Sequence, residues 1–294
     1  MTTFILDREE KRTRPVLASL RPRGAGWLVL PAAVLLLLFF AVPISWLLAA
    51  SVSYPQLGLQ NFAALYEKTI YLRVLGNTVV ISGVTTFWCA IIGYPLAFTM
   101  ANGSPRVRRA LVFIILIPFW TSLLVRTFAW MVLLQKQGLI NDLLMSAGLI
   151  DSPVALIYNR LGVYIGMVQV LLPFMIFPLY SVMVRIDKSY SQAAATLGAP
   201  PIRNFFRIYL PLSLPGVLSG ASLVFISALG YYITPALLGG PADMMIAQMI
   251  EKQISQFGNW GLAGALAVVL LVGTGVSLAI VHRVLGVRAG WRRA

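Results

Sequence analysis

The side chains of this sequence that are best placed for chemistry lie within long apolar stretches. Arg126 is the charged residue deepest in such a stretch, which makes it a functional-site hypothesis, although a structural partner or snorkelling explains it equally well. Tyr231 and Tyr232 offer aromatic faces and hydroxyls, which suit an ammonium group by cation–π contact, a zwitterion by hydrogen bonding, or ordinary packing. If these residues do more than pack, the chemistry that they predict is the binding of a small polar ligand.

The residue clusters that catalysis requires are missing from the sequence. No glycine-rich loop ends in Gly-Lys-Ser or Gly-Lys-Thr, so the chain itself does not hydrolyse ATP. The long apolar stretches hold no aspartate or glutamate, and no nucleophile or metal-ligand constellation is apparent. The single cysteine, Cys89, fits a small buried hydrophobe. We predict that the chain is not an enzyme, holds no metal and binds no cofactor of its own.

The composition indicates a membrane protein. Hydrophobic residues make up 59% of the chain, charged residues only 11%, and the mean hydropathy is +0.84, whereas a soluble domain is about a quarter charged. A helix that crosses a bilayer needs roughly 20 mostly apolar residues, and runs of that length suit helices better than barrel strands. Six such runs lie near residues 27–50, 75–100, 110–134, 161–184, 213–238 and 260–281. The predicted fold class is therefore an all-α integral membrane protein with six transmembrane helices.

The net charge of +14 is concentrated in particular segments. Most Lys and Arg residues precede the first run, lie in the second-to-third and fourth-to-fifth loops, or follow the last run. The positive-inside rule places these segments, and so both termini, in the cytoplasm. The predicted organisation is a cytoplasmic tail over residues 1–26, a membrane domain over 27–284 with a cytoplasmic loop over 185–212, and a cytoplasmic tail over 285–294. The positive charges follow the positive-inside rule, so their function is to orient the chain in the membrane. We therefore expect contact with membrane lipid and none with nucleic acid.

The long cytoplasmic loop is predicted to fold into two short helices. Ser189 or Ser191 is the predicted N-cap of the first, and Gly198 suits the left-handed conformation that ends it. The second helix is predicted to begin at Pro201 and to be stopped by Pro211. The alanines between these caps present almost no side-chain bulk, so another protein is able to approach their backbone closely.

The same loop carries a long spaced pattern, formed by Gln192, Ala193, Ala194, Gly198, Ile208, Leu210 and Pro211. This pattern resembles the "EAA" loop of permease subunits in type I ATP-binding-cassette importers. One difference is that Gln192 stands where that motif usually has glutamate. An amide keeps the size and the hydrogen-bonding ability of the glutamate but loses its charge. Any ion pair that the motif glutamate makes is therefore in question here, whereas docking of the loop is not.

The resemblance extends over most of the chain. It includes Asn61-Phe62, Asn77-Thr78, residues 118–130, Leu172-Pro-Phe174 and residues 230–240, which look like the first permease of spermidine/putrescine-type systems. The resemblance implies a multi-pass inner-membrane permease whose coupling loop docks on a cytoplasmic ATPase dimer. It also implies that this ATPase uses the ATP, that a second permease subunit pairs with the chain, and that an extracytoplasmic solute-binding protein delivers cargo.

The cargo stays open between several amine-bearing classes. The candidate translocation path comprises Trp120, Arg126, Tyr231, Tyr232 and Thr234. The resemblance points to a polyamine such as spermidine or putrescine, while opine-like, aminophosphonate and amino-acid-like solutes remain alternatives. An ion-coupled secondary transporter is disfavoured, because neither internal repeats nor buried ionisable coupling residues are evident. The lack of catalytic clusters likewise disfavours a membrane-embedded enzyme.

Two further features each have two interpretations. Prolines and glycines interrupt the second, fourth and fifth runs, and they either bend helices that line a pathway or let helices pack closely. The two outer loops, residues 51–74 and 135–160, are predicted to contain short helices on the outer membrane surface. A partner docks there, or these loops are ordinary ordered connections.

Overall fold

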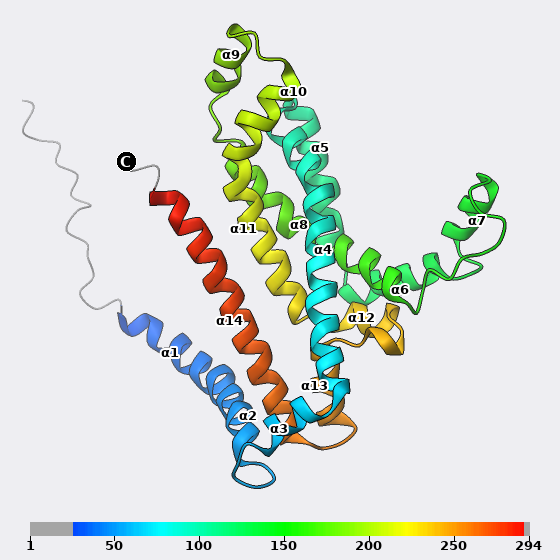
Figure 1. Ribbon diagram of the computed structural model, residues 1–294, viewed down its shortest axis with the longest axis vertical. Helices are drawn as coiled ribbons and strands as arrows, with labels where there is room; N and C mark the ends of the chain where they lie inside the picture. Colours follow the sequence, from blue (N-terminus) through cyan, green and yellow to red (C-terminus); the bar gives the residue numbers. More distant parts are fainter. Residues whose placement is uncertain (1–25, 291–294) are drawn as a thin grey trace, which may run out of the picture. The chain divides into compact units, whose positions relative to one another are not determined.

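The computed structural model describes residues 26–290, and along them the chain is helical with no β-strand, which confirms the all-α prediction (Figure 1). The predicted tails lie outside these residues, except for Gly26 and residues 285–290. The α-helices are α1 Gly26–Leu36, α2 Val42–Ser53, α3 Gln60–Glu67, α4 Thr69–Asn102, α5 Pro105–Leu116, α6 Leu123–Leu134, α7 Leu139–Ser146, α8 Arg160–Met183, α9 Lys188–Thr196, α10 Pro201–Asn204, α11 Leu210–Leu229, α12 Ile233–Leu238, α13 Ile246–Ser255 and α14 Trp260–Gly290. Between them lie the π-helical turns η2 Leu37–Ala41 and η4 Phe205–Tyr209 and the 3₁₀ turns η3 Ile117–Trp120 and η5 Pro241–Asp243.

Within the described residues, five helical segments are each long and apolar enough to cross a membrane. They are Leu30–Ser53, Thr69–Asn102, Arg160–Met183, Pro201–Leu229 and Trp260–Val281. They correspond to the first, second, fourth, fifth and sixth predicted runs. The chain divides into two compact units, residues 1–46 and 47–294. The described part of the first unit consists of α1, η2 and the start of α2, and the sites below belong to the second unit.

The third predicted run, residues 110–134, is not a single helix. The segment Pro105–Trp120 and the segment Leu123–Ser146 are bent by 100° relative to each other. Pro118 lies inside η3, and Thr121 has an extended backbone with φ −82° and ψ 145°. Proline donates no backbone hydrogen bond, so helical bonding stops there. Counted as one broken span, this pair brings the total in the described residues to six.

The fifth predicted run, residues 213–238, also differs. α11 ends at Leu229, and residues 230–232 separate it from the short helix α12. At its other end the helical segment extends back to Pro201 through η4. The fifth predicted run is therefore not one helix, because α11 ends before Gly230.

The core is built by α4, α8 and α11, which pack against one another in all three pairs (Figure 1). Their close approach depends on glycine. A Cβ atom at Gly220 of α11 would lie 2.8 Å from Sδ and 2.9 Å from the carbonyl oxygen of Met175 in α8. A Cβ at Gly93 of α4 would lie 2.9 Å from Cγ of the same methionine. At these two positions the packing interpretation holds, whereas Gly273 in α14 has open space around it.

Both outer loops contain the short helices predicted for them, α3 and α7. A buried asparagine orders each loop. Asn61 donates from Nδ2 to the carbonyl oxygens of Ser51 (2.9 Å) and Tyr54 (2.8 Å). Asn141 donates to the carbonyl oxygens of Gln135 and Val154 and accepts from the Val154 N–H at 2.9 Å. These loops are ordered connections in the chain itself.

Candidate functional site

The first candidate site is the loop over residues 185–212, whose helices α9 and α10 lie at one end of the α4–α8–α11 bundle (Figure 1). The N-cap of α9 is Asp187 and not Ser189 or Ser191. Its carboxylate accepts the Ser189 N–H at 2.9 Å, and this hydrogen bond lowers the pKa of Asp187 from its ordinary value. Gly198 has φ +76° and ends the helix as predicted. Aspartate suits an N-cap as well as serine does, and Asp187 was missed because the helix begins at Lys188, earlier than predicted.

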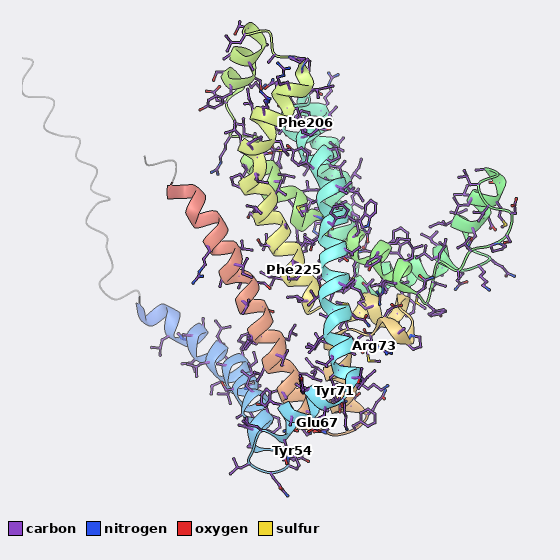
Figure 2. The ribbon with its side chains drawn as sticks, viewed as in Figure 1. Tyr54, Glu67, Tyr71, Arg73, Phe206 and Phe225 are labelled. Carbon is purple, nitrogen blue, oxygen red and sulfur yellow. The ribbon has the colours of Figure 1, made fainter. Side chains whose placement is uncertain are left out.

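The loop exposes three large apolar side chains. Leu197 is 88% exposed, Ile202 73% and Phe206 61%, and Phe206 lies at the loop end of the bundle (Figure 2). Exposed apolar side chains of this size suit an interaction surface. Ala193 is exposed too, but Ala194 is only 6% exposed. The methyl group of Ala194 is therefore buried, while the close approach of a partner to the backbone of these alanines stays a prediction.

The second helix of the loop does not stop at Pro211. α10, η4 and α11 form one helical segment from Pro201 to Leu229. In η4 the Leu210 N–H donates to the Phe205 carbonyl, which is the wider bonding of a π-helical turn. Because Pro211 has no N–H to donate, this wider turn allows the chain to pass through proline without ending the helix.

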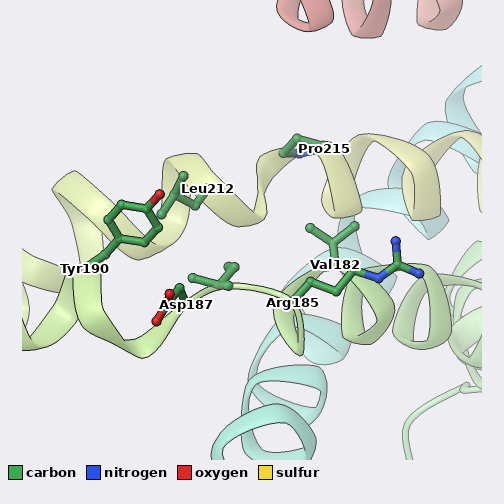
Figure 3. Close-up of a pocket in the computed structure, with 7 residues that line it drawn as sticks. Val182, Arg185, Asp187, Tyr190, Leu212 and Pro215 are labelled. Carbon is green, nitrogen blue, oxygen red and sulfur yellow. The ribbon is translucent and has the colours of Figure 1, made fainter. Parts of the chain in front are cut away.

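Two hollows border α9. One, of about 640 Å³, lies between α8, α9 and α11, with Tyr190 on one side and Leu212 and Pro215 on another (Figure 3). The other, of about 540 Å³, is bordered by Gln192 of α9 and by Phe98 and Asn102 of α4, among other residues. The first loop helix is thus bordered by open space on more than one of its flanks.

The second half of the loop is attached firmly to α4. Tyr209, the variable position inside the Ile208-x-Leu210-Pro211 pattern, is 8% exposed. Its hydroxyl accepts a hydrogen bond of 2.9 Å from Asn102 Nδ2. One turn away, the hydroxyls of Tyr94 and Ser213 lie 2.8 Å apart. Its hydrogen-bond partner lies more than 100 residues earlier in the chain, so no local sequence pattern indicates the role of Tyr209.

The other motif positions are distributed around this attachment. Gln192 and Pro211 are exposed, and Ile208 and Leu210 are partly buried. The side chain of Gln192 makes no hydrogen bond within the described part of the chain.

The second candidate site is a cavity of about 400 Å³ beside α8. The break between η3 and α6 borders it, as does the break between α11 and α12. Arg126 and Tyr231 both line it, with Thr121, Ser227 and Phe174 among the other lining residues. Arg126 is the charged residue in this lining. Its Nη2 donates to the Thr121 carbonyl at 3.1 Å, while its Nε is buried with no hydrogen-bond partner.

Helix α6 adds to the positive character of this cavity. Arg126 lies in the first turn of α6, where the helix dipole is positive and disfavours a cation. Ser122, the N-cap, makes no side-chain hydrogen bond to the free N–H groups of that turn. The arrangement is suited to hold an electron-rich group of a ligand near Arg126.

The other residues of the candidate path are not part of this cavity. Trp120 is 77% exposed and Tyr232 39% exposed, and neither lines the cavity. Thr234 is fully buried, and its methyl group occupies the space next to Gly166 of α8. Of the predicted path residues, Arg126 and Tyr231 line the cavity together, and the buried side chain of Thr234 lies beside Tyr231 without lining it.

Comparisons with known proteins agree with this architecture. Residues 93–289 match the family model described as "Binding-protein-dependent transport system inner membrane component". The chain is 36% identical to the spermidine/putrescine transport system permease protein PotB of Haemophilus influenzae, over 73% of this chain and 74% of that one. It is 33% identical to PotB of Escherichia coli K12, over 88% and 94%.

A solved structure of a bacterial alginate ABC transporter, in complex with an alginate-bound periplasmic protein, has a chain with the same fold. The TM-score is 0.71 at 19% identity, over 88% of this chain and 92% of that one. The family match, the relatives and the membrane-spanning helices together exclude an enzyme. The chain belongs to the binding-protein-dependent transport system inner membrane components, and is a multi-pass inner-membrane permease of an ATP-binding-cassette importer.

Proposed function

We propose that this permease imports a small amine-bearing solute, with a polyamine of the spermidine/putrescine class as the first candidate. In this proposal a cytoplasmic ATPase dimer hydrolyses the ATP and the chain binds no cofactor itself. A second, different permease subunit pairs with it, and an extracytoplasmic solute-binding protein delivers the cargo. The observation that carries the proposal is the exposure of Leu197, Ile202 and Phe206, which we take together as the docking face of loop 185–212.

This face has the properties of a docking surface for a soluble partner. Burying one leucine or phenylalanine side chain is worth about 1.5–3 kcal/mol, so three such residues supply a substantial part of a protein interface. Arg203 and Arg207, both exposed, border the apolar residues and provide a polar rim. ATP favours the closed form of the ATPase dimer. Through the docked loop, this closed form favours one of the two access states of the permease, inward-open or outward-open, so the populations of these states shift.

The docking role is tested by Leu197→Asp in the permease co-expressed with its ATPase, sister permease and binding protein. We expect at least a tenfold lower yield of ATPase on purification, because a charge replaces an apolar anchor. Leu57→Asp is the matched control, since Leu57 is also 88% exposed but lies near Pro55, outside the loop. Equal ATPase retention in both variants would contradict the proposal.

A polyamine cargo is supported by the relatives named as spermidine/putrescine permeases and by Tyr231. The ring of Tyr231 borders the cavity of about 400 Å³, a size within the ordinary range of small-molecule sites. An aromatic face there attracts an ammonium group by about 0.5–2 kcal/mol. Tyr231 is the lining residue that a polyamine would use.

A second candidate cargo is an amine-bearing solute that also carries a carboxylate or phosphonate. The specific observation in its favour is Arg126, which has a buried Nε without a partner and no carboxylate beside it in the cavity lining. A 27% identical relative over 93% of this chain is named as a putative 2-aminoethylphosphonate transport system permease, PhnU of Salmonella typhimurium. An anionic group would satisfy both Arg126 and the N-terminus of α6.

A further inference from the structure

We propose that η4 is the joint through which the ATPase moves the membrane helices, and that Tyr209 is its positioning residue. Tyr209 ties the loop to the end of α4, so that a displacement of the docked loop is passed to α4. This role of Tyr209 rests on the proposed docking of the ATPase to loop 185–212. It adds the path along which movement of the ATPase reaches helix α4.

The joint is a compact aromatic cluster closed by hydrogen bonds. The ring of Tyr209 lies 5.0 Å from that of Phe98 in α4, edge to face, and stacks on Phe205 at 6.2 Å with 14° between the planes. Its hydroxyl accepts the 2.9 Å hydrogen bond from Asn102, whose Nδ2 also donates to the Phe98 carbonyl at 3.1 Å. Edge-to-face ring pairs hold a preferred geometry, so this contact resists sliding.

A second hydrogen bond strengthens the same joint one turn further into the bundle. Tyr94 of α4 and Ser213 of α11 are joined through their hydroxyls at 2.8 Å, and Ser213 Oγ is also 2.9 Å from the Leu210 carbonyl. The ring of Tyr94 packs edge to face on Phe205 at 5.8 Å. Both ends of η4 thereby contact α4, Phe205 through its ring and Tyr209 through its ring and hydroxyl.

Within the described residues, the first loop helix, α9, makes no side-chain hydrogen bond and no aromatic ring contact to the bundle, and it packs mainly against the neighbouring elements α10 and η4. One hollow, of about 640 Å³, lies between α9 and α11, and another, of about 540 Å³, lies between α9 and the joint, whose residues Phe98, Asn102, Phe205 and Tyr209 also line it. The joint is held to α4 by hydrogen bonds and ring contacts, so it transmits strain to the bundle more directly than α9 does. Movement of α9 therefore reaches the bundle through η4, at Tyr209.

The π-helical turn explains why the joint lies here. The extra residue in the turn allows the chain to accept Pro211 and places Phe205 and Tyr209 on the face toward α4. Such turns recur at functional sites of helices. The work of the ATPase thus enters at the end of α4 and reaches α8 through the shared core.

The test compares Tyr209→Phe with the unmodified chain in the complete transporter, reconstituted with its ATPase, sister permease and binding protein. The substitution keeps the ring packing and removes the hydroxyl. We expect the solute imported per ATP hydrolysed to fall about fivefold, the factor that one net hydrogen bond of about 1 kcal/mol corresponds to. The ATPase yield on purification should stay unchanged, and the Tm of the complex should fall by no more than about a few degrees.

Two companion variants make this result specific. Asn102→Leu removes the donor of the same hydrogen bond and should have the same effect, with no further loss in the double variant. Tyr180→Phe is the matched control, since Tyr180 borders the same core cluster but its hydroxyl makes no hydrogen bond in the described part of the chain. If Tyr209→Phe lowers ATPase retention together with coupling, Tyr209 is structural and the proposal is overturned.

A rescue experiment tests whether the joint moves as one body. Cysteines replace Asn102 and Tyr209, and a short bifunctional thiol reagent links them; the native Cys89 is fully buried. Uptake per ATP should be low before linking and return to within about twofold of the unmodified chain after it. Loss of uptake on linking, with the ATPase still bound, would overturn the proposal. Because both tests use complexes that retain their ATPase, their failure leaves the docking result of Leu197→Asp standing.

Discussion

At the scale of single residues, the two sites differ in how far the sequence revealed them. Arg126 and Tyr231 were predicted from a charge inside an apolar run and from aromatic chemistry, and they line one cavity. Tyr209 and Asn102 were not predicted, because a hydrogen bond between side chains 107 positions apart leaves no local pattern. Thr234 was predicted as a path residue but fills space beside Gly166. Local chemistry is readable from sequence, but long-range partners are not.

The cargo class is decided at Arg126. For a solute with an anionic group, Arg126→Gln should lower uptake roughly 10- to 100-fold, because a charge-assisted hydrogen bond of about 1.5–3 kcal/mol is lost. For spermidine or putrescine, uptake should stay equal or rise, since a repelling charge is removed from the cavity. The measurement is uptake of each solute by the reconstituted transporter.

The matched control for this experiment is Arg73→Gln, since Arg73 is an exposed arginine of α4 that does not line the cavity. Uptake of both solute classes should be unaffected by it. A loss of spermidine uptake in Arg126→Gln, with Arg73→Gln normal, would contradict a purely repulsive role of Arg126 toward polyamines.

At the scale of helices, continuous apolar runs were predicted well and interruptions were not. The second, fourth and sixth predicted runs lie in α4, α8 and α14. α4 and α8 continue through their internal prolines, because packed neighbours hold these helices together. The third run breaks at Thr121 and the fifth ends at Leu229. Hydropathy measures the length of an apolar stretch but is insensitive to the direction of the backbone, so it predicted single spans in both places.

Helix packing around Met175 is expected to limit stability. Gly220→Ala should destabilise the permease by about 1–3 kcal/mol, since the new Cβ overpacks against the Met175 carbonyl at the α8–α11 contact. Gly273→Ala, in open space on α14, should change stability by less than about 1 kcal/mol. The thermal unfolding midpoints of both variants in the same detergent give the comparison. Equal midpoints would mean that the α8–α11 contact is looser than its geometry indicates.

At the scale of the whole molecule, the chain has a membrane core and, separate from it, a loop that we propose as the docking surface for the ATPase. The bundle of α4, α8 and α11 is close-packed through glycines, and loop 185–212 carries its apolar residues on the outside. The family match and the 33–36% identical relatives place this architecture in an importer. The sequence has no phosphate-binding loop, so in our proposal another subunit hydrolyses the ATP, and the exposed apolar face is where that subunit docks.

In the proposed function, ATP hydrolysis by a partner subunit drives import through loop 185–212. The most direct measurement is uptake of radiolabelled solute into proteoliposomes that contain the complete transporter, with ATP enclosed on the side of the ATPase and the binding protein on the other. We predict that uptake requires both ATP and the binding protein, and that Leu197→Asp abolishes it while Leu57→Asp does not. Uptake that proceeds equally without ATP, or unchanged in Leu197→Asp, would contradict the account.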